Sequence, residues 1–233
     1  MVRNKVLIGV STGEYARRAD FYDYFNMMEK PEGSLHLLGH DRSPAKNRNN
    51  LIQAALDTEC THVLLIDDDM AYRPDALNQL LEHDKDIVSC LYLSRAYPHA
   101  PLVFDLADEK GAAFPLYLIP NQQRLVPIVA AGFGFLLINT SVFQKLEKPY
   151  VRLGELDAQE WCDDIGFFKR VREAGIQSYC DLECKVGHMG TMIIWPNNDE
   201  AGNWYSGYDT NGKSAINTPQ VVPNPTYQFK EMK

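Results

Sequence analysis

Three consecutive carboxylates follow an apolar run near the middle of the first half of the chain. Residues 61–70 read THVLLIDDDM, so that Asp67, Asp68 and Asp69 come directly after four apolar residues. Two carboxylates at positions i and i+2 on a chain that leaves a strand can bind one hard divalent cation. Asp67 and Asp69 are therefore candidate ligands for Mn²⁺ or Mg²⁺, which could in turn hold an anionic substrate.

The surroundings of this stretch support a ligand site but leave a plainer alternative. The unbroken apolar run at 63–66 is typical of a central strand covered on both faces. Open α/β sheets bind ligands at the carboxyl ends of such strands. The alternative is an Asp-rich turn that caps the next helix, because Arg73, Pro74 and Asp75 have the pattern of a helix start.

A second acidic pair stands at the start of a later helix. Residues 159–174 predict a helix closed by Gly175. Asp164 falls on the buried stripe together with the apolar residues that follow at helical spacing, Phe167, Phe168 and Val171. Asp163 falls to one side, near Arg170. A carboxylate on an inward face is costly without a partner or a function, and the helix N-terminus helps to keep it ionised. Asp164 is thus a candidate catalytic residue, with a capping acid as the alternative.

Arg48 and His188 are single residues whose positions suggest a ligand. Arg48 lies on the core-facing stripe of a helix that Ser43 and Pro44 start, so it needs an anionic partner. That partner could be structural, such as Asp67 or Asp41, or it could be a nucleotide phosphate or ring. His188 stands between two glycines after an extended segment, and a lone histidine is more often structural than a ligand.

Small residues at two strand ends are candidate donor-binding positions. A first strand over residues 5–10 ends in Ser11 and Thr12, which can offer hydroxyls and backbone amides to a ligand, although an ordinary strand-to-helix loop has the same pattern. Gly132 and Gly134 interrupt an apolar strand over 128–138. Glycine within a strand often marks a bulge or the close approach of a ligand to the backbone.

The elements that must position these residues alternate between strand and helix up to about residue 93. This alternation predicts an α/β fold with a mostly parallel sheet. Residues 94–127 are punctuated by proline and predict a hairpin-rich insertion on the acceptor side. We expect one domain over residues 1–190, and a loop or tail over 191–233 that could act as a lid on the site.

Composition narrows the class of protein. The 233 residues carry 45% hydrophobic residues and a net charge of -8, which argues against general polyanion binding. No stretch has the pattern of a signal peptide or the roughly 20 apolar residues that span a bilayer, so the sequence predicts a soluble cytoplasmic protein. The five cysteines lack paired zinc-ligand spacing and predict reduced, mostly buried thiols.

The order of these motifs resembles the glycosyltransferases of the GT-A fold, over about residues 5–190. The resemblance implies a Rossmann-like mixed sheet and a nucleotide-sugar donor, with a UDP-sugar as the expected one. It implies that Asp67, Asp69 and His188 hold Mn²⁺ or Mg²⁺ on the donor diphosphate. The donor side would further include Ser11, Thr12, Arg48, Asp68, Gly132 and Gly134. The late acidic pair, here Asp163 and Asp164, would contact the acceptor or act as base.

The chemistry leaves several alternatives open. Asp164 would be the general base of an inverting reaction, or would position the acceptor in a retaining one. A haloacid-dehalogenase-like phosphohydrolase with Asp67 as nucleophile is the rival enzyme, although its motif usually lies on the first strand. A non-catalytic nucleotide- or carbohydrate-binding module is the third possibility. The acceptor could be a small molecule, a glycan, a protein or a modified DNA base, and the sequence does not predict the oligomeric state.

Overall fold

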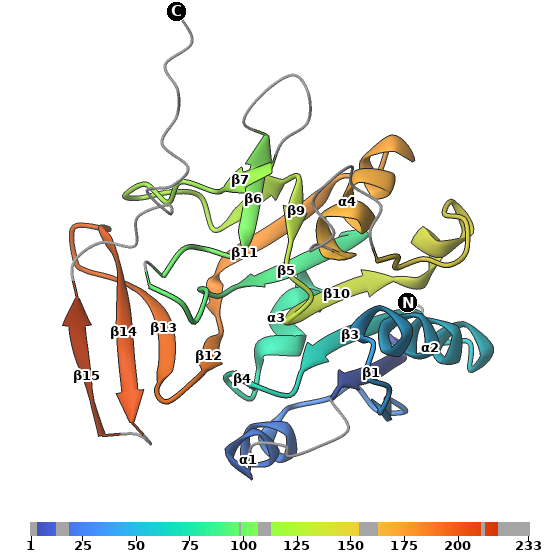
Figure 1. Ribbon diagram of the computed structural model, residues 1–233, viewed down its shortest axis with the longest axis horizontal. Helices are drawn as coiled ribbons and strands as arrows, with labels where there is room; N and C mark the ends of the chain where they lie inside the picture. The colour runs from blue at the N-terminus through green and yellow to red at the C-terminus, as the bar shows by residue number, and fades with distance from the viewer. Residues whose placement is uncertain are drawn as a thin grey trace, which may run out of the picture.

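A seven-stranded sheet forms the centre of the computed structural model, which describes residues 4–12, 19–97, 99–106, 113–153, 163–210 and 213–218. The strands lie in the order β2-β1-β3-β10-β5-β11-β8 (Figure 1). Their bounds are β1 Val6–Ser11, β2 Leu35–Gly39, β3 His62–Asp67, β5 Ile87–Leu91, β8 Leu125–Ile128, β10 Phe135–Asn139 and β11 Ser178–Lys185.

The sheet is mixed, with most strands running in one direction. β1 pairs in parallel with both β2 and β3. β10 pairs antiparallel with β3 and with β5, so β5 has the direction of β3, and β11 is parallel to β5. Only β10 and β8 run the opposite way among the seven strands. The predicted mixed, mostly parallel α/β sheet flanked by helices is confirmed.

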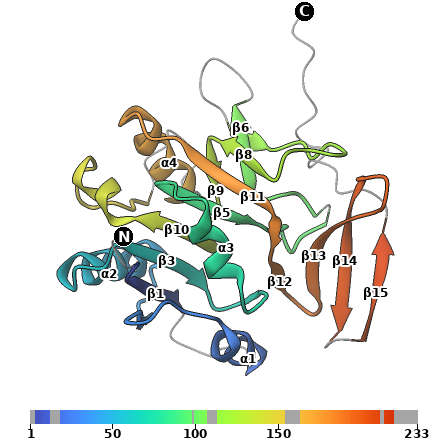
Figure 2. The same cartoon turned by 180° about the vertical axis from the view of Figure 1, so that it is seen from behind.

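Helices cover both faces of this sheet (Figure 2). They are α1 Ala19–Met27, α2 Pro44–Asp57, α3 Ala76–Glu82 and α4 Asp163–Glu173, with a short 3₁₀ helix η1 at Thr140–Gln144. Alternate residues of β3 point to opposite layers: Val63 and Leu65 pack in one cluster with α2 and α4, whereas Leu64 and Ile66 pack in the other with α1 and α3. The continuous apolar run thus has the doubly covered position that its pattern predicts.

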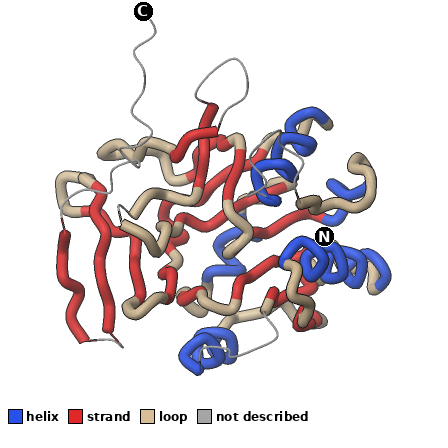
Figure 3. Tube along the Cα trace, viewed as in Figure 1, coloured by secondary structure: helices blue, strands red, loops and turns tan. Residues whose placement is uncertain are grey.

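A second sheet of five strands lies beside the central sheet (Figure 3). Its order is β15-β14-β13-β12-β4, with bounds β4 Met70–Ala71, β12 Gly187–Met189, β13 Ile193–Asn198, β14 Trp204–Thr210 and β15 Lys213–Thr218. The predicted loop over 191–233 is therefore wrong for residues 193–198, 204–210 and 213–218, which form strands. Pro196 and Gly207 obscure the strand pattern, and antiparallel pairing between β13 and β14 sets the structure instead. Residues 219–233 lie outside the described ranges.

The segment before β10 also differs in part from the sequence prediction. A three-stranded sheet joins β6 Val103–Leu106, β7 Ala113–Pro115 and β9 Ala130–Ala131. The β6 and β7 strands form the hairpin expected within 94–127. The single strand predicted over 128–138 is instead divided between β8, β9 and β10, because the chain turns at residues 132–134. None of the helices in the described ranges is long and apolar enough to cross a membrane.

Candidate functional site

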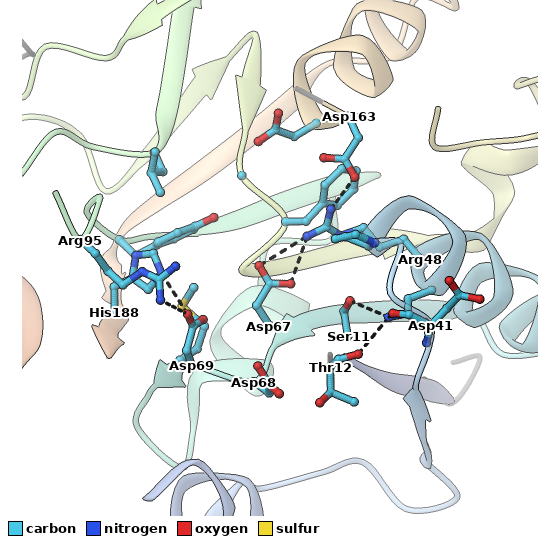
Figure 4. A pocket seen from close by; sticks show the side chains of 18 of the residues that line it. Ser11, Thr12, Asp41, Arg48, Asp67, Asp68, Asp69, Arg95, Asp163 and His188 are labelled. Carbon is cyan, nitrogen blue, oxygen red and sulfur yellow. Dashed lines mark hydrogen bonds and ion pairs between the residues drawn. The ribbon is translucent and has the colours of Figure 1, made fainter. Parts of the chain in front are cut away.

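A cavity of about 360 Å³ opens at the carboxyl ends of β1, β2 and β3 (Figure 4). Ten of the eleven predicted site residues line it, namely Ser11, Thr12, Arg48, Asp67, Asp68, Asp69, Gly132, Asp163, Asp164 and His188. These residues come from six separate parts of the sequence. The α/β topology brings them together because the parallel strands end at one edge of the sheet.

The triple aspartate forms the turn that joins the two sheets. Asp67 is the last residue of β3, and β4 starts directly after Asp69. β4 pairs with β12, and the Met189 amide donates to the Asp69 carbonyl at 2.8 Å. This pairing brings His188 beside Asp69. The capping alternative is wrong, because β4 separates the triple aspartate from α3 and Asp75 occupies the N-cap of that helix.

His188 has a defined orientation. Its Nδ1 lies 2.8 Å from the Leu93 carbonyl oxygen, and since a carbonyl only accepts, Nδ1 must carry the hydrogen. In the neutral ring the lone pair is then on Nε2, which lies 3.5 Å from Asp69 Oδ2. The histidines that bind metals are usually oriented by such a hydrogen bond from the other ring nitrogen. Two electron-rich atoms face each other here, so the pair favours a cation.

Arg95 supplies a positive charge at this position. Its Nη1 lies 3.0 Å from Asp69 Oδ2, the same oxygen that faces His188. Sequence reasoning did not single out Arg95. The available signal was its place just after β5, whose carboxyl end lies at the same edge of the sheet as that of β3.

Arg48 joins the two acidic groups of the site. Its Nη1 donates to Asp163 at 2.6 Å, and its Nη2 donates to Asp67 at 3.1 Å. The guanidinium also stacks 4.5 Å from the centre of the Phe133 ring. Asp67 is one of the two structural partners that the sequence suggested for Arg48, and the structure contains this ion pair. The predicted position of Asp163 near Arg170 is wrong, because the first residue of α4 turns its side chain toward Arg48.

The charges at this edge alter the acidity of the groups that line it. Burial lowers the pKa of Arg48, but the carboxylates of Asp67 and Asp163 outweigh it, so the net pKa is raised. Burial raises the pKa of Asp67, with a smaller rise from the neighbouring Asp69 charge and a partial offset by Arg48. Burial raises the pKa of Asp164 to about 6. The helix N-terminus does not keep Asp164 as acidic as expected, because its burial has the larger effect.

Tyr92 explains the two glycines. A Cβ atom on Gly132 would lie 2.0 Å from Tyr92 Oη, and one on Gly134 would lie 2.8 Å from Tyr92 Cζ. The Gly134 amide donates to Tyr92 Oη at 3.0 Å. The glycines therefore make room for this buried ring, which lines the cavity and which sequence reasoning missed. Gly132 also lines the cavity, whereas Gly134 does not; ligand contact with their backbone stays a prediction.

Asn47 holds together the ends of β1 and β2. Its Nδ2 donates to the carbonyl oxygens of Thr12, at 3.1 Å, and Asp41, at 2.9 Å. Its Oδ1 accepts from the Asp41 amide at 2.6 Å. Asn47 is 1% exposed, so these bonds replace water contacts that the buried amide has lost. They fix the loops around Ser11 and Thr12 at the cavity wall.

The predicted three-residue metal set is not assembled. Among the residues that the structure describes, no group of three His, Cys, Asp or Glu side chains is arranged to hold a metal ion. Asp67 points to Arg48, whereas Asp69 points to His188 and Arg95 (Figure 4). The described cysteines are free and buried, and Cys184 Sγ lies 2.7 Å from Cys90 Sγ. Cys162 lies outside the described ranges.

Comparisons with known proteins show the fold. No protein-family model and no curated protein sequence matches the chain. The crystal structure of A197 from STIV matches with a TM-score of 0.60 and 13% identity, over 81% of this chain and 88% of that one. This match shows a shared fold and no more. The mixed, mostly parallel sheet flanked by helices is the α/β architecture that the sequence predicts, and it is consistent with a Rossmann-like GT-A fold.

Two further solved structures match more distantly. CMP:2-keto-3-deoxy-manno-octonic acid synthetase complexed with CTP has a TM-score of 0.43 and 11% identity, over 76% of this chain and 89% of that one. TarS 1-349 of S. aureus has a TM-score of 0.39 and 11% identity, over 76% of this chain and 57% of that one.

Proposed function

We propose that this protein is a metal-dependent glycosyltransferase that moves a sugar from a nucleotide-diphosphate donor, a UDP-sugar, to an acceptor hydroxyl. The observation that carries the proposal is the set of side chains that one cavity at the carboxyl edge of the sheet brings together. It combines an oriented carboxylate-imidazole pair, Asp69 and His188, with the buried carboxyl of Asp164. In a metal-dependent transfer a cation stabilises the leaving diphosphate and a carboxylate deprotonates or positions the acceptor, and the cavity offers groups for both roles.

Asp69 and His188 would hold the metal. One carboxylate oxygen and one imidazole nitrogen suit Mn²⁺, and the hydrogen bond from Nδ1 to the Leu93 carbonyl leaves Nε2 as the ligand atom. The metal would stabilise the negative charge that develops on the leaving diphosphate. Asp67 would join as a third ligand only after it leaves Arg48. Until then it positions Arg48 and closes that side of the cavity.

The nucleoside would lie on the other side of the triple aspartate. Ser11 and Thr12 end β1 there, and Asp68 lines the same cavity. Hydroxyl and carboxylate oxygens in this position can bind the hydroxyls of a ribose or of the sugar. The Asn47 hydrogen bonds keep this wall in place.

Asp164 is the better candidate for the base of the late acidic pair. Asp163 is bound to the Arg48 guanidinium, so its carboxylate oxygen already has a partner. Burial raises the pKa of Asp164 to about 6, so this group is mostly ionised at neutral pH and yet binds a proton more readily than an ordinary carboxylate. In an inverting reaction Asp164 would remove the acceptor proton. In a retaining reaction it would position the acceptor.

The test incubates the protein with Mn²⁺ and each of a panel of nucleotide sugars. Sugar transfer or slow donor hydrolysis is measured through the nucleoside diphosphate that is released. Asp69→Asn should lose this turnover, whereas Asp57→Asn, which changes an exposed carboxylate on α2, should keep it. Binding of donors without turnover would favour the binding module. Robust hydrolysis of an aryl phosphate with Mg²⁺, lost in Asp67→Asn, would favour the phosphohydrolase.

A further inference from the structure

Two arginines contact the triple aspartate, and they differ in how firmly they are held. The Arg48 side chain is 9% exposed and binds two carboxylates, Asp67 and Asp163. The Arg95 side chain is 52% exposed, and its ion pair is with Asp69. Removing Arg48 from its partners would leave charges buried, whereas an ion pair as exposed as that of Arg95 adds little to stability. Arg95 is therefore the cation that can leave.

The backbone around Arg95 is held by hydrogen bonds and a β-bridge, whereas about half of the side chain is exposed. The Leu93 carbonyl accepts from His188, and Leu93 forms a β-bridge with Pro101. The Ser94 amide donates to the Ala100 carbonyl at 2.8 Å. The guanidinium can thus move by side-chain rotation, without a change in the loop that orients His188.

We propose that Arg95 is an exchangeable cation that neutralises Asp69 when no metal is bound and that transfers to the diphosphate of the donor when the metal binds. The inference rests on the proposed function. Its basis is that Arg95 Nη1 and His188 Nε2 face one oxygen, Asp69 Oδ2, so that a metal held between His188 and this oxygen would compete with the Arg95 ion pair. The displaced planar guanidinium is a good partner for the phosphate oxygens that enter with the metal.

This exchange would couple metal binding to diphosphate binding. A metal ion that binds alone must displace Arg95 and leave its charge beside the new cation. A diphosphate that binds at the same time gives Arg95 a new partner, so each ligand strengthens the binding of the other. The cavity would then take up metal and donor together.

The test measures binding by the full-length protein, independently of turnover. Mn²⁺ alone is titrated by electron paramagnetic resonance, and methylenediphosphonate, a diphosphate that resists hydrolysis, is titrated by calorimetry with and without Mn²⁺. In Arg95→Ala, Mn²⁺ alone should bind about three- to tenfold more tightly, because it no longer displaces a guanidinium. Methylenediphosphonate with Mn²⁺ should bind about tenfold more weakly, because charge-assisted hydrogen bonds are lost.

Two further variants keep the test decisive. Arg95→Lys retains the charge and should keep Mn²⁺ affinity within about twofold of the wild type. Arg42→Ala removes an equal charge from another residue that lines the cavity. If it tightens Mn²⁺ as much as Arg95→Ala does, general cavity charge accounts for the effect and the proposal is wrong. Unchanged or weaker Mn²⁺ binding in Arg95→Ala also overturns it.

The outcome is separable from that of the proposed function. If the opposite changes in Mn²⁺ and diphosphonate affinity occur but no sugar is transferred from any donor, the exchange is correct and the site serves another diphosphate reaction. If sugar transfer occurs but Arg95→Ala leaves both affinities unchanged, the glycosyltransferase assignment holds and Arg95 is only a surface ion-pair partner of Asp69.

Discussion

Arg48 on α2 donates a hydrogen bond of 2.6 Å to Asp163 on α4, a residue 115 positions further along the chain. The same guanidinium binds Asp67 at the end of β3. One buried cation therefore connects the strand that carries the triple aspartate to the helix that carries the late acidic pair. This connection fixes the two sides of the cavity relative to each other.

Arg48→Met should destabilise the fold by about 2–4 kcal/mol, because it leaves Asp67 and Asp163 partly buried without their counter-charge. Methionine fills much of the same volume, so lost packing contributes little. Urea denaturation at neutral pH measures the free energy of unfolding. The control Arg73→Met removes an arginine whose side chain is 72% exposed and should change stability by less than about 0.5 kcal/mol. A similarly small effect at Arg48 would show that the bridge does not hold the cavity together.

The sequence predicted the edge of the sheet at which the site lies, but not how the side chains pair across it. Strand-helix alternation and the apolar run before Asp67 suffice to place strand ends together, because topology alone determines that edge. The sequence could not predict that Asp163 binds Arg48 and not Arg170. The Arg48 partner depends on how α4 packs against α2, which is a long-range contact that no local pattern encodes.

The second sheet and the glycines show the same limit. Residues 193–198 contain Pro196, and 204–210 contain Gly207, so neither reads as a clear strand, and only their mutual pairing makes them strands. Gly132 reads as a point of ligand approach. The residue that lies against Gly132 is Tyr92, which is 40 positions earlier in the chain, and only the fold brings the two together.

Asp164→Asn should abolish most sugar transfer while it stabilises the fold. The pKa of Asp164 is raised from its ordinary value of 3.8 to about 6 by burial. The folded protein therefore binds more protons than the unfolded chain between these values, and the free energy of unfolding falls as pH rises from about 4 to 6. Asparagine removes this penalty, so the variant should gain about 1–3 kcal/mol at pH 7.5. Turnover should fall about a hundredfold or more if Asp164 is the base.

Measurements at two pH values separate this effect from general stabilisation. At pH 3.5 the carboxyl is protonated in the folded protein and mostly protonated in the unfolded chain, so Asp164→Asn and the wild type should have nearly the same free energy of unfolding in urea. Asp57→Asn on the exposed face of α2 should show no gain at either pH. For the wild type, kcat/KM should rise with pH through about 6. A flat profile, or loss of stability in Asp164→Asn at pH 7.5, would contradict the assignment.

His188→Gln should weaken Mn²⁺ binding at least tenfold with the fold intact, because the amide loses the ring nitrogen that faces Asp69. Asp69→Asn should have an effect of the same size. Electron paramagnetic resonance measures free Mn²⁺, and circular dichroism checks the fold. The control His99→Gln changes a histidine that is hydrogen-bonded to the Ser94 carbonyl and does not line the cavity. Full Mn²⁺ affinity in both His188→Gln and Asp69→Asn would overturn this metal site.

Gly132→Ala should destabilise the fold by about 1–3 kcal/mol, because its Cβ would lie 2.0 Å from the Tyr92 hydroxyl oxygen. Tyr92→Phe alone should cost about 1 kcal/mol, since the Gly134 amide loses its acceptor. In the double variant the closest atom is gone, so the combined loss should be smaller than the sum of the two single losses.

Thermal or urea unfolding of the four proteins in this cycle gives the coupling energy. Gly190→Ala is the matched control, because the nearest atom to its new Cβ would be 3.4 Å away. Additive losses would mean that the ring moves aside at no cost and that Gly132 is required for another reason. A strong positive coupling would instead show that this glycine is needed because Tyr92 fills the space behind the cavity wall, which leaves only the open side of Gly132 for a ligand.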